Sequence, residues 1–271
     1  DDIIYKGVVY NEMRGAYSSA ESQIQDQIIS HLHMGSTYSH DSGGNPYEIP
    51  KLTLENFLAF HKKHYHPSNA LLFLHGDVKT EEIFPLLDDY LNEFNRENLD
   101  IEIQHSNDVS LIQDKHFEYN GDSDSSAKKD SFLSYAVSLG DSTNIEEHLA
   151  REILNELLIK SQSSPVKKAL FDKELGDDLF GVFSETSGLD FGFVLKGSDE
   201  KNMHEFIHTL EDTLRVMVEE GIDKNALEAA INKITLNLKE AGGEHSGIEY
   251  FITVMKAFTQ GKDPLTLLSY K

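Results

Sequence analysis

The predicted elements favour an α+β fold, in which an antiparallel-rich sheet is covered by helices on one face. Short apolar runs typical of strands are followed by longer stretches with helical spacing, so strands and helices come in runs along the chain. A parallel sheet of βαβ units would alternate them, which makes that class the weaker prediction. We expect strands at residues 70–75, 115–120, 131–139, 179–186 and 191–195, and later helices at 144–160, 199–220, 223–241 and 246–260.

The first hundred residues carry further helix signals. Residues 3–17 have helical spacing but no capping residue before them, so we expect the chain to begin inside a domain. Ser18 and Glu21 have the spacing of a capping box, which predicts a second helix that ends near Gly35. Two further helices are expected from the caps Thr53 and Thr80 to about Tyr65 and Phe94.

A polar stretch without helical spacing, residues 95–112, separates the two halves of the chain. It predicts a linker at residues 98–112 between a first unit, residues 1–97, and a second unit, residues 113–271. In the second unit, Pro165 directly after Ser164 predicts the first turn of a short helix.

Composition excludes several classes of function. The chain contains no cysteine, which excludes disulfides, thiolate zinc sites and cysteine nucleophiles. Its formal net charge of -23 opposes binding to a phosphate backbone, so nucleic acid is not expected as a partner. No apolar run is long enough to cross a bilayer, and the first six residues lack the basic and apolar parts of a targeting segment. We therefore expect no membrane partner either.

Histidine clusters are the first candidates for metal binding. His61 and His64 are three positions apart on a predicted helix, but Lys62 and Lys63 between them would repel a cation and no nearby carboxylate completes a site. We interpret this stretch, which continues to His66, as a helix end. His31 and His33 are two positions apart and therefore point to different faces of a helix.

Other candidate sites are weaker. The turn at residues 42–44, Ser-Gly-Gly, has neither the lysine of a P-loop nor the spacing of a dinucleotide site, so we interpret it as a turn only. Glu185 with Asp190, or Asp177 with Asp178, could be paired as carboxylates. Acidic residues are so frequent in this chain that we assign these pairs no role.

Glu12 lies on the first predicted helix, beside its apolar face. If a carboxylate in that position faced inward, it would need a cation or hydrogen bonds to offset the cost of burial. From the residues alone, the prediction is an ordinary surface glutamate.

A resemblance changes that interpretation. The string Lys6-Gly-Val-Val-Tyr-Asn-Glu-Met-Arg-Gly-Ala-Tyr-Ser-Ser19 closely resembles the third-ligand helix of the presequence-protease and falcilysin branch of the pitrilysin/insulinase family of zinc metallopeptidases. The same branch is resembled, in order, by stretches at residues 41–46, 49–53, 60–70 and 76–77, and more weakly at 163–170 and 261–265.

The resemblance implies a fold of two related α+β units, each an antiparallel-rich sheet with helices on one face, the first of them incomplete. It also implies that Glu12 is the third zinc ligand of the intact enzyme. The family's H-x-x-E-H motif, which supplies two zinc ligands and the general base, does not occur in the chain. No catalytic or cofactor-binding residue is therefore assigned here, and we expect this chain alone neither to hold zinc nor to be active.

The implied function is that of a fragment of a zinc endopeptidase or oligopeptidase that degrades short, unfolded, presequence-like peptides. Its partners would be those peptides and the remaining domains of the same polypeptide. One alternative is a non-catalytic scaffold or peptide-binding member of the superfamily, and another is an acidic interaction module in which Glu12 binds no metal. Cysteine absence favours the cytoplasm, with the mitochondrial matrix or another organelle as the alternative.

Overall fold

The structure is a computed structural model of the chain, and all structural statements refer to the residues that it describes. These are residues 4–99, 114–119, 131–141, 144–183, 188–240, 246–259, 263–265 and 268. We call residues 4–99 the N-terminal segment and the described residues from 131 onward the C-terminal segment.

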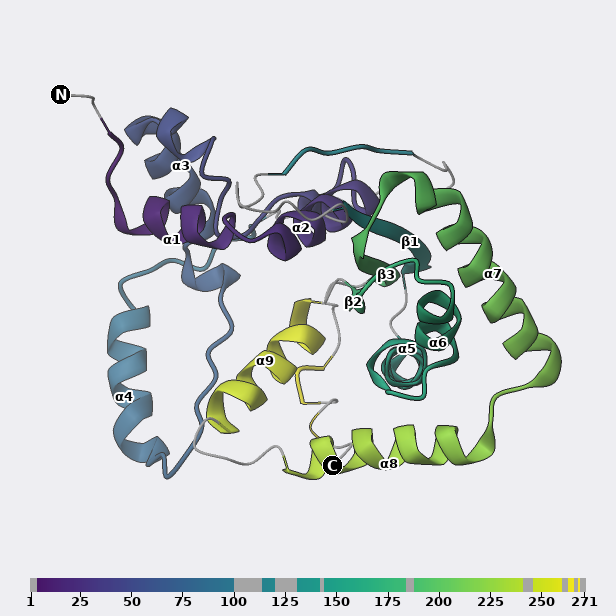
Figure 1. Cartoon of the computed structure of the whole chain (residues 1–271). Coiled ribbons are helices and arrows are strands. Elements are labelled where there is room, and N and C mark those ends of the chain that lie inside the picture. The colour runs from purple at the N-terminus through teal and green to yellow at the C-terminus, as the bar shows by residue number, and fades with distance from the viewer. Residues whose placement is uncertain are drawn as a thin grey trace.

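Helices dominate both segments, and the strands lie in the C-terminal one (Figure 1). The helices of the N-terminal segment are α1 (Val8–Ala16), α2 (Ala20–Leu32), α3 (Leu54–His64) and α4 (Thr80–Leu91). The C-terminal segment contains β1 (Ser131–Asp141), α5 (Ile145–Asn155), a π-helical turn (Glu156–Lys160), α6 (Pro165–Asp172), β2 (Asp178–Val182), β3 (Gly188–Ser198), α7 (Met203–Glu220), α8 (Lys224–Glu240) and α9 (Ser246–Thr259).

The three strands form an antiparallel sheet in the order β1-β3-β2, so β3 is central. Val194 of β3 is paired with Ser134 on one side and with Phe180 on the other. Because side chains alternate along a strand, odd-numbered and even-numbered residues of β3 face opposite sides of the sheet. The predicted α+β class is thereby confirmed.

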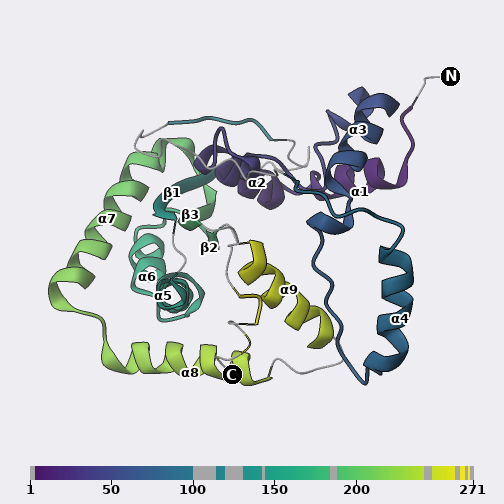
Figure 2. The same ribbon diagram turned by 180° about the vertical axis from the view of Figure 1, so that it is seen from behind.

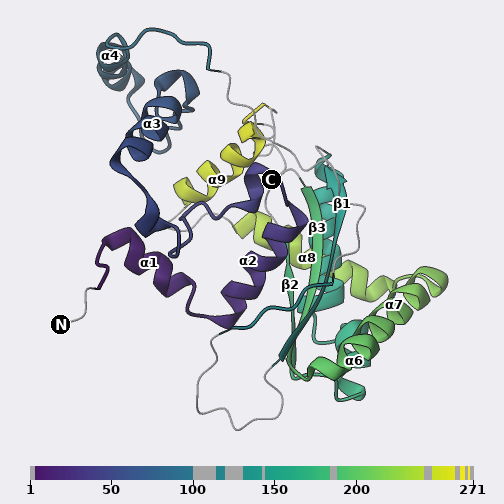
Figure 3. The ribbon, with the colours of Figure 1, turned by 90° about the horizontal axis from the view of Figure 1, so that it is seen from above.

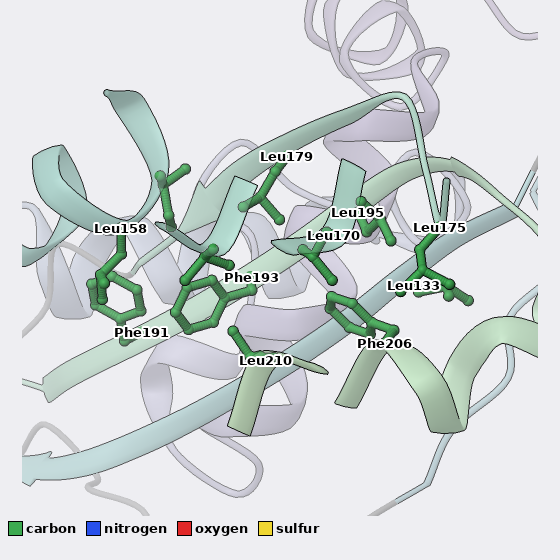
Figure 4. Packing of buried hydrophobic residues seen from close by; sticks show 12 residues of the cluster. Leu133, Leu158, Leu170, Leu175, Leu179, Phe191, Phe193, Leu195, Phe206 and Leu210 are labelled. Atoms are coloured by element: carbon green, nitrogen blue, oxygen red, sulfur yellow. The ribbon is translucent and has the colours of Figure 1, made fainter. Parts of the chain in front are cut away.

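The odd-numbered face of β3 carries the main hydrophobic core (Figure 4). Phe191, Phe193 and Leu195 point into it and meet buried apolar side chains from helices on that face. The buried partners from the π-helical turn, α6 and α7 are Leu158, Ile159, Val166, Leu170, Phe206 and Leu210.

The even-numbered face is covered by α2, a helix of the N-terminal segment. Ile28 of α2 is buried in a second cluster with Val182 and Val194 of the sheet. Viewed from above, α2 lies on one side of the strands and α6 and α7 lie on the other (Figure 3). The sheet is therefore covered on both faces. The helices of the C-terminal segment lie on one face, as predicted for each unit, and α2 of the N-terminal segment covers the other.

Several predicted helix starts are confirmed. Thr53 caps α3 by accepting a hydrogen bond from the Asn56 backbone N–H, and Ser164 caps α6, in which Pro165 is the first residue. The capping-box position is wrong by one residue, because Ser19 and not Ser18 accepts the hydrogen bond that begins α2. Similarly, α4 includes Thr80, and its cap position is Lys79.

Three predicted elements differ from the structure. The strand expected at residues 70–75 is extended but unpaired in any sheet, because none of the described residues of the N-terminal segment forms a neighbouring strand. Residues 114–119 likewise form no strand. The first helix is shorter than expected: it begins only at Val8, after an extended Gly7. Most of the predicted linker, residues 100–112, lies outside the described residues.

The helices of the N-terminal segment other than α2 are largely exposed to solvent. Helices α3 and α4 lie at the opposite end of the molecule from α7, and none of their residues is buried (Figures 1 and 2). Large apolar side chains on them are exposed to solvent, including Phe57, Phe60 and Phe84. Patches of this kind mark surfaces that contact another protein segment. No helix of the described residues combines the length and apolar composition needed to cross a membrane.

Leu170→Ala should lower the free energy of unfolding by about 2–5 kcal/mol, because the variant leaves a cavity in the main core. Leu170 is fully buried, at 0% exposure, whereas Leu236 on α8 is 52% exposed. Leu236→Ala is the matched control and should cost less than about 1 kcal/mol. Urea titration followed by circular dichroism measures both. Equal losses in the two variants would contradict the described core.

Candidate functional site

Glu12, the predicted zinc ligand, lies near the middle of α1 and is exposed. No residue of α1 is buried, and the apolar Val8 on the same helix is 75% exposed. The start of the helix, at Gly7, has no side-chain cap. Helix α1 is therefore held mainly by contacts near its C-terminal end.

One of these contacts joins α1 to the glycine-rich turn that follows α2. The Asp41 carboxylate accepts a hydrogen bond of 2.8 Å from the Gly43 backbone N–H, and the Gly44 backbone N–H donates to the Asp41 carbonyl. A Cβ atom at Gly43 would lie 2.3 Å from the Met13 sulfur, so the glycine lets the turn approach α1 closely. The interpretation of residues 42–44 as a turn is confirmed.

Tyr17 joins the end of α1 to α2. Its backbone carbonyl accepts a hydrogen bond of 2.8 Å from the Gln23 side chain, and its hydroxyl donates to Asp26 at 3.4 Å. Burial raises the pKa of the Tyr17 phenol, and the negative charges of Asp26 and Asp41 raise it further. Tyr17 therefore stays protonated and acts as a donor.

Asp26 and Asp41 are neighbouring carboxylates beside this phenol. Burial raises the pKa of Asp26, the charge of Asp41 raises it further, and the hydrogen bond from Tyr17 opposes the shift. The structure thus brings together Tyr17, Asp26 and Asp41, a cluster that the sequence gave no reason to group.

Zinc in peptidases is held by three protein ligands and a water. Among the described residues, no three histidine, aspartate or glutamate side chains are grouped so that they could hold a metal ion. Glu12 by itself therefore does not form a zinc site, and the part of the chain that the structure describes does not fit the metal without further ligands.

The histidines of residues 61–66 have structural contacts. The His61 ring stacks on Tyr65 at 4.8 Å between centroids, and the His64 ring lies 4.4 Å from that of Phe60. His66 accepts a hydrogen bond from the Ser68 backbone N–H and lies near Glu97. These contacts support the interpretation of the stretch as a helix end.

His31 and His33 point to different places, as predicted. His31 contacts the Gln27 carbonyl of its own helix, whereas His33 Nε2 lies 2.7 Å from a carboxylate oxygen of Asp190 on β3. Both His33 and Asp190 are buried, and they are 157 positions apart in the sequence. Asp190, to which the sequence analysis assigned no role, thus joins the C-terminal segment to the N-terminal segment through His33. Glu185, its suggested partner, lies outside the described residues.

The sequence contains a metal-binding pattern that our sequence analysis missed. Residues 204–208 read H-E-x-x-H, the pattern of a different class of zinc peptidases, and they lie on α7. His204 and His208 are exposed with ring centroids 6.5 Å apart, but Glu205 is bound to Lys173 at 2.6 Å. No described residue supplies a third ligand there. The arrangement is a surface histidine pair and not a peptidase centre.

Comparison with known proteins identifies the family. Over residues 51–234 the sequence matches the family described as peptidase M16 inactive domain. The chain belongs to the M16 peptidase family. The resemblance to pitrilysin/insulinase-type metallopeptidases is thereby confirmed for the M16 chain, and the matched part is of the inactive type.

Curated relatives agree with this assignment. The chain is 36% identical over 275 residues to protein HypA of Clostridium perfringens. The alignment covers 100% of this chain but 28% of that protein. The chain is 32% identical over 281 residues to presequence protease 1, chloroplastic/mitochondrial, of Arabidopsis thaliana, with 100% of this chain and 26% of that protein covered. The M16 chain thus spans about a quarter of the length of these relatives.

A solved structure shares the fold. An M16-like peptidase from Alicyclobacillus acidocaldarius superposes with a TM-score of 0.67 at 17% identity, covering 97% of this chain and 62% of that one. At this level of identity the likeness supports the fold of the M16 chain and says nothing of its substrates.

Asp26→Asn should make the M16 chain less sensitive to pH. Because the folded-state pKa of Asp26 is raised, the folded protein holds this proton more tightly, and stability falls as pH rises from the unfolded value of about 3.9 through the folded value. Asparagine can still accept the hydrogen bond from the Tyr17 hydroxyl, but it does not titrate, so the variant lacks this loss of stability. The melting temperature of the variant minus that of the parent should therefore increase between pH 3 and pH 7. A difference independent of pH would contradict the carboxylate cluster.

Proposed function

We propose that this chain is part of a zinc endopeptidase of the M16 family that degrades short unfolded peptides, and that Glu12 is the third zinc ligand of the whole protein. The observation that carries the proposal is the third-ligand string at residues 6–19, which lies within a similarity that covers all of this chain and 26% of a presequence protease. Zinc in this role activates a bound water for attack on the peptide carbonyl. The other ligands and the general base come from an H-x-x-E-H motif elsewhere in the polypeptide.

The proposed roles of the two predicted units differ. Residues 1–97 belong to the catalytic unit, residues 98–112 are a linker, and residues 113–271 form the second, non-catalytic unit. The position of the sheet supports this division, because all three strands among the described residues lie in the C-terminal segment with a core of their own. The match to an inactive domain, at residues 51–234, covers most of the second unit and also residues 51–97 of the first, so it supports a non-catalytic role for the second unit without supporting the boundary at 98–112.

The proposed partners are unfolded peptides and the remaining domains of the same polypeptide. The exposed apolar side chains of α3 and α4, with the unpaired extended residues 70–75, offer surface for those domains. We keep the cytoplasm as the predicted compartment, with the mitochondrial matrix or another organelle as the alternative. The Arabidopsis relative is named as a chloroplastic and mitochondrial protein, which supports the organellar alternative.

A second candidate function is a non-catalytic scaffold or peptide-binding subunit of the same superfamily. One observation favours it: the matched family is that of an inactive domain. The two functions differ in the remaining polypeptide, since an intact H-x-x-E-H motif supports the peptidase and a degenerate one supports the scaffold.

Glu12→Gln should weaken zinc binding of the H-x-x-E-H-containing polypeptide by more than about 100-fold, since loss of a residue that only orients a ligand already costs about 10–100-fold. Isothermal titration with zinc measures the affinity. Glu55→Gln, which changes an exposed glutamate on α3, is the matched control and should leave it unchanged. All variants carry His204→Ala and His208→Ala, so that the surface histidine pair does not contribute. Equal affinity of the Glu12→Gln and Glu55→Gln variants would overturn the ligand assignment.

A further inference from the structure

Helix α2 is the element of the N-terminal segment that is packed against the sheet of the C-terminal segment. Its apolar residues Ile24, Ile28, Ile29 and Leu32 meet the even-numbered face of the sheet. Gly192 of β3 and its partner Ala136 of β1 are small, and a Cβ atom at Gly192 would lie 3.4 Å from that of Ala136. Small residues at this position leave room for the helix to lie close to the strands.

Two polar pairs lie at the two ends of this apolar contact. At the C-terminal end of α2, His33 Nε2 lies 2.7 Å from the Asp190 carboxylate, with side-chain exposures of 9% and 0%. At the N-terminal end, the Lys196 ammonium is bound to the Glu21 carboxylate and also lies 5.8 Å from the centroid of the Phe132 ring. We call these two contacts the end pairs of α2.

The spacing of the end pairs matches the geometry of a helix on a strand. Glu21 and His33 are twelve positions apart, which spans about 18 Å on a helix that rises about 1.5 Å per residue. Asp190 and Lys196 are six positions apart on one face of β3, which spans about 20 Å at about 3.4 Å per residue. Since the order is reversed, α2 runs antiparallel to β3, and both pairs can form only in one register.

The end pairs also differ in chemistry, which fixes direction. A carboxylate at the start of α2 meets a lysine, and a histidine at its end meets an aspartate. If α2 were turned end for end, Glu21 would meet Asp190 and His33 would meet Lys196. The reversed contact of Glu21 with Asp190 would bring two carboxylates together, and Lys196 would lose its carboxylate partner, so the reversed orientation is unfavourable.

The position of helix α1 depends on where α2 lies on the sheet. Tyr17 at its C-terminal end is bonded to Gln23 and Asp26 of α2, and Ser18 donates to the Gly15 carbonyl at 2.6 Å. Glu12 is five positions before Tyr17 on the same helix. A rotation or shift of α2 on the sheet therefore moves Glu12.

We propose that the end pairs of α2, Glu21 with Lys196 and His33 with Asp190, are positioning residues through which the non-catalytic segment sets the place of Glu12. The inference rests on the proposed role of Glu12 as a zinc ligand. The C-terminal segment then acts on the metal site through α2 and α1, without contributing a ligand.

The docking is tested first on this chain by hydrogen exchange with mass spectrometry. Lys196→Glu places two carboxylates together and should speed exchange of the α2 amides at least about threefold, in the range expected for an exposed ion pair. The swapped variant Glu21→Lys with Lys196→Glu should return exchange to within about twofold of the parent. Lys173→Glu breaks an exposed pair with Glu205 on the opposite face of the sheet and should leave α2 unchanged.

The effect on the site is tested on the polypeptide that carries H-x-x-E-H, with zinc as the probe. Lys196→Glu should weaken zinc binding at an unchanged melting temperature, and the swapped variant should restore it. Asp190→Asn, which keeps the shape of the buried side chain, gives a second measurement and should also weaken binding. Weaker zinc binding at an unchanged melting temperature is the readout that a general loss of stability would not produce, and recovery in the swapped variant assigns the effect to this pair.

The outcomes separate the two proposals. If α2 exchange is the same in Lys196→Glu as in the parent, the end pairs do not hold the helix and the inference fails. It also fails if Glu12→Gln weakens zinc binding while Lys196→Glu and Asp190→Asn do not. If Glu12→Gln itself leaves zinc binding unchanged, the proposed ligand role fails, whatever the exchange experiment shows.

Discussion

Burial of β3 on both faces is the interaction on which the rest of the structure depends. The odd-numbered side chains of this strand pack against the π-helical turn and α6, which precede it, and against α7, which follows it. The even-numbered ones pack against α2, which lies more than 150 positions earlier. A strand buried on one face only would leave Val194 and its neighbours in water. Covering the second face with α2 therefore joins the N-terminal and C-terminal segments in one structure.

On the proposed function, this arrangement gives the C-terminal segment a specific physical task. A metal ligand must be held within a fraction of an ångström of its productive place, and residues outside the coordination shell do that work. Helix α1 has no buried residue and is held through Tyr17 and Met13, so its position follows from what α2 and the turn at residues 41–44 contact. Those contacts depend in turn on the packing of α2 against the sheet of the C-terminal segment.

Motif context decides how two similar patterns are interpreted. Residues 204–208 match H-E-x-x-H letter by letter, yet α7 presents both histidines to solvent and its glutamate binds a lysine. Glu12 belongs to no such short pattern. It was predicted as a ligand from the longer string at residues 6–19 and from further resembling stretches that follow it in the family's order along the chain. A metal site needs ligands that converge on one point, which a spacing rule along one helix cannot guarantee.

The sequence by itself determined the class of fold and the family. It also determined the helices from residue 144 onward, because local signals such as Ser164 before Pro165 act within one turn of chain. It could not place the run at residues 70–75, whose strand needs a neighbour to supply backbone hydrogen bonds. Nor could it pair His33 with Asp190 or group Tyr17 with Asp26 and Asp41, since those contacts depend on where α2 lies. Tertiary structure decided that placement, because an amphipathic helix specifies that one face is buried but not which surface buries it.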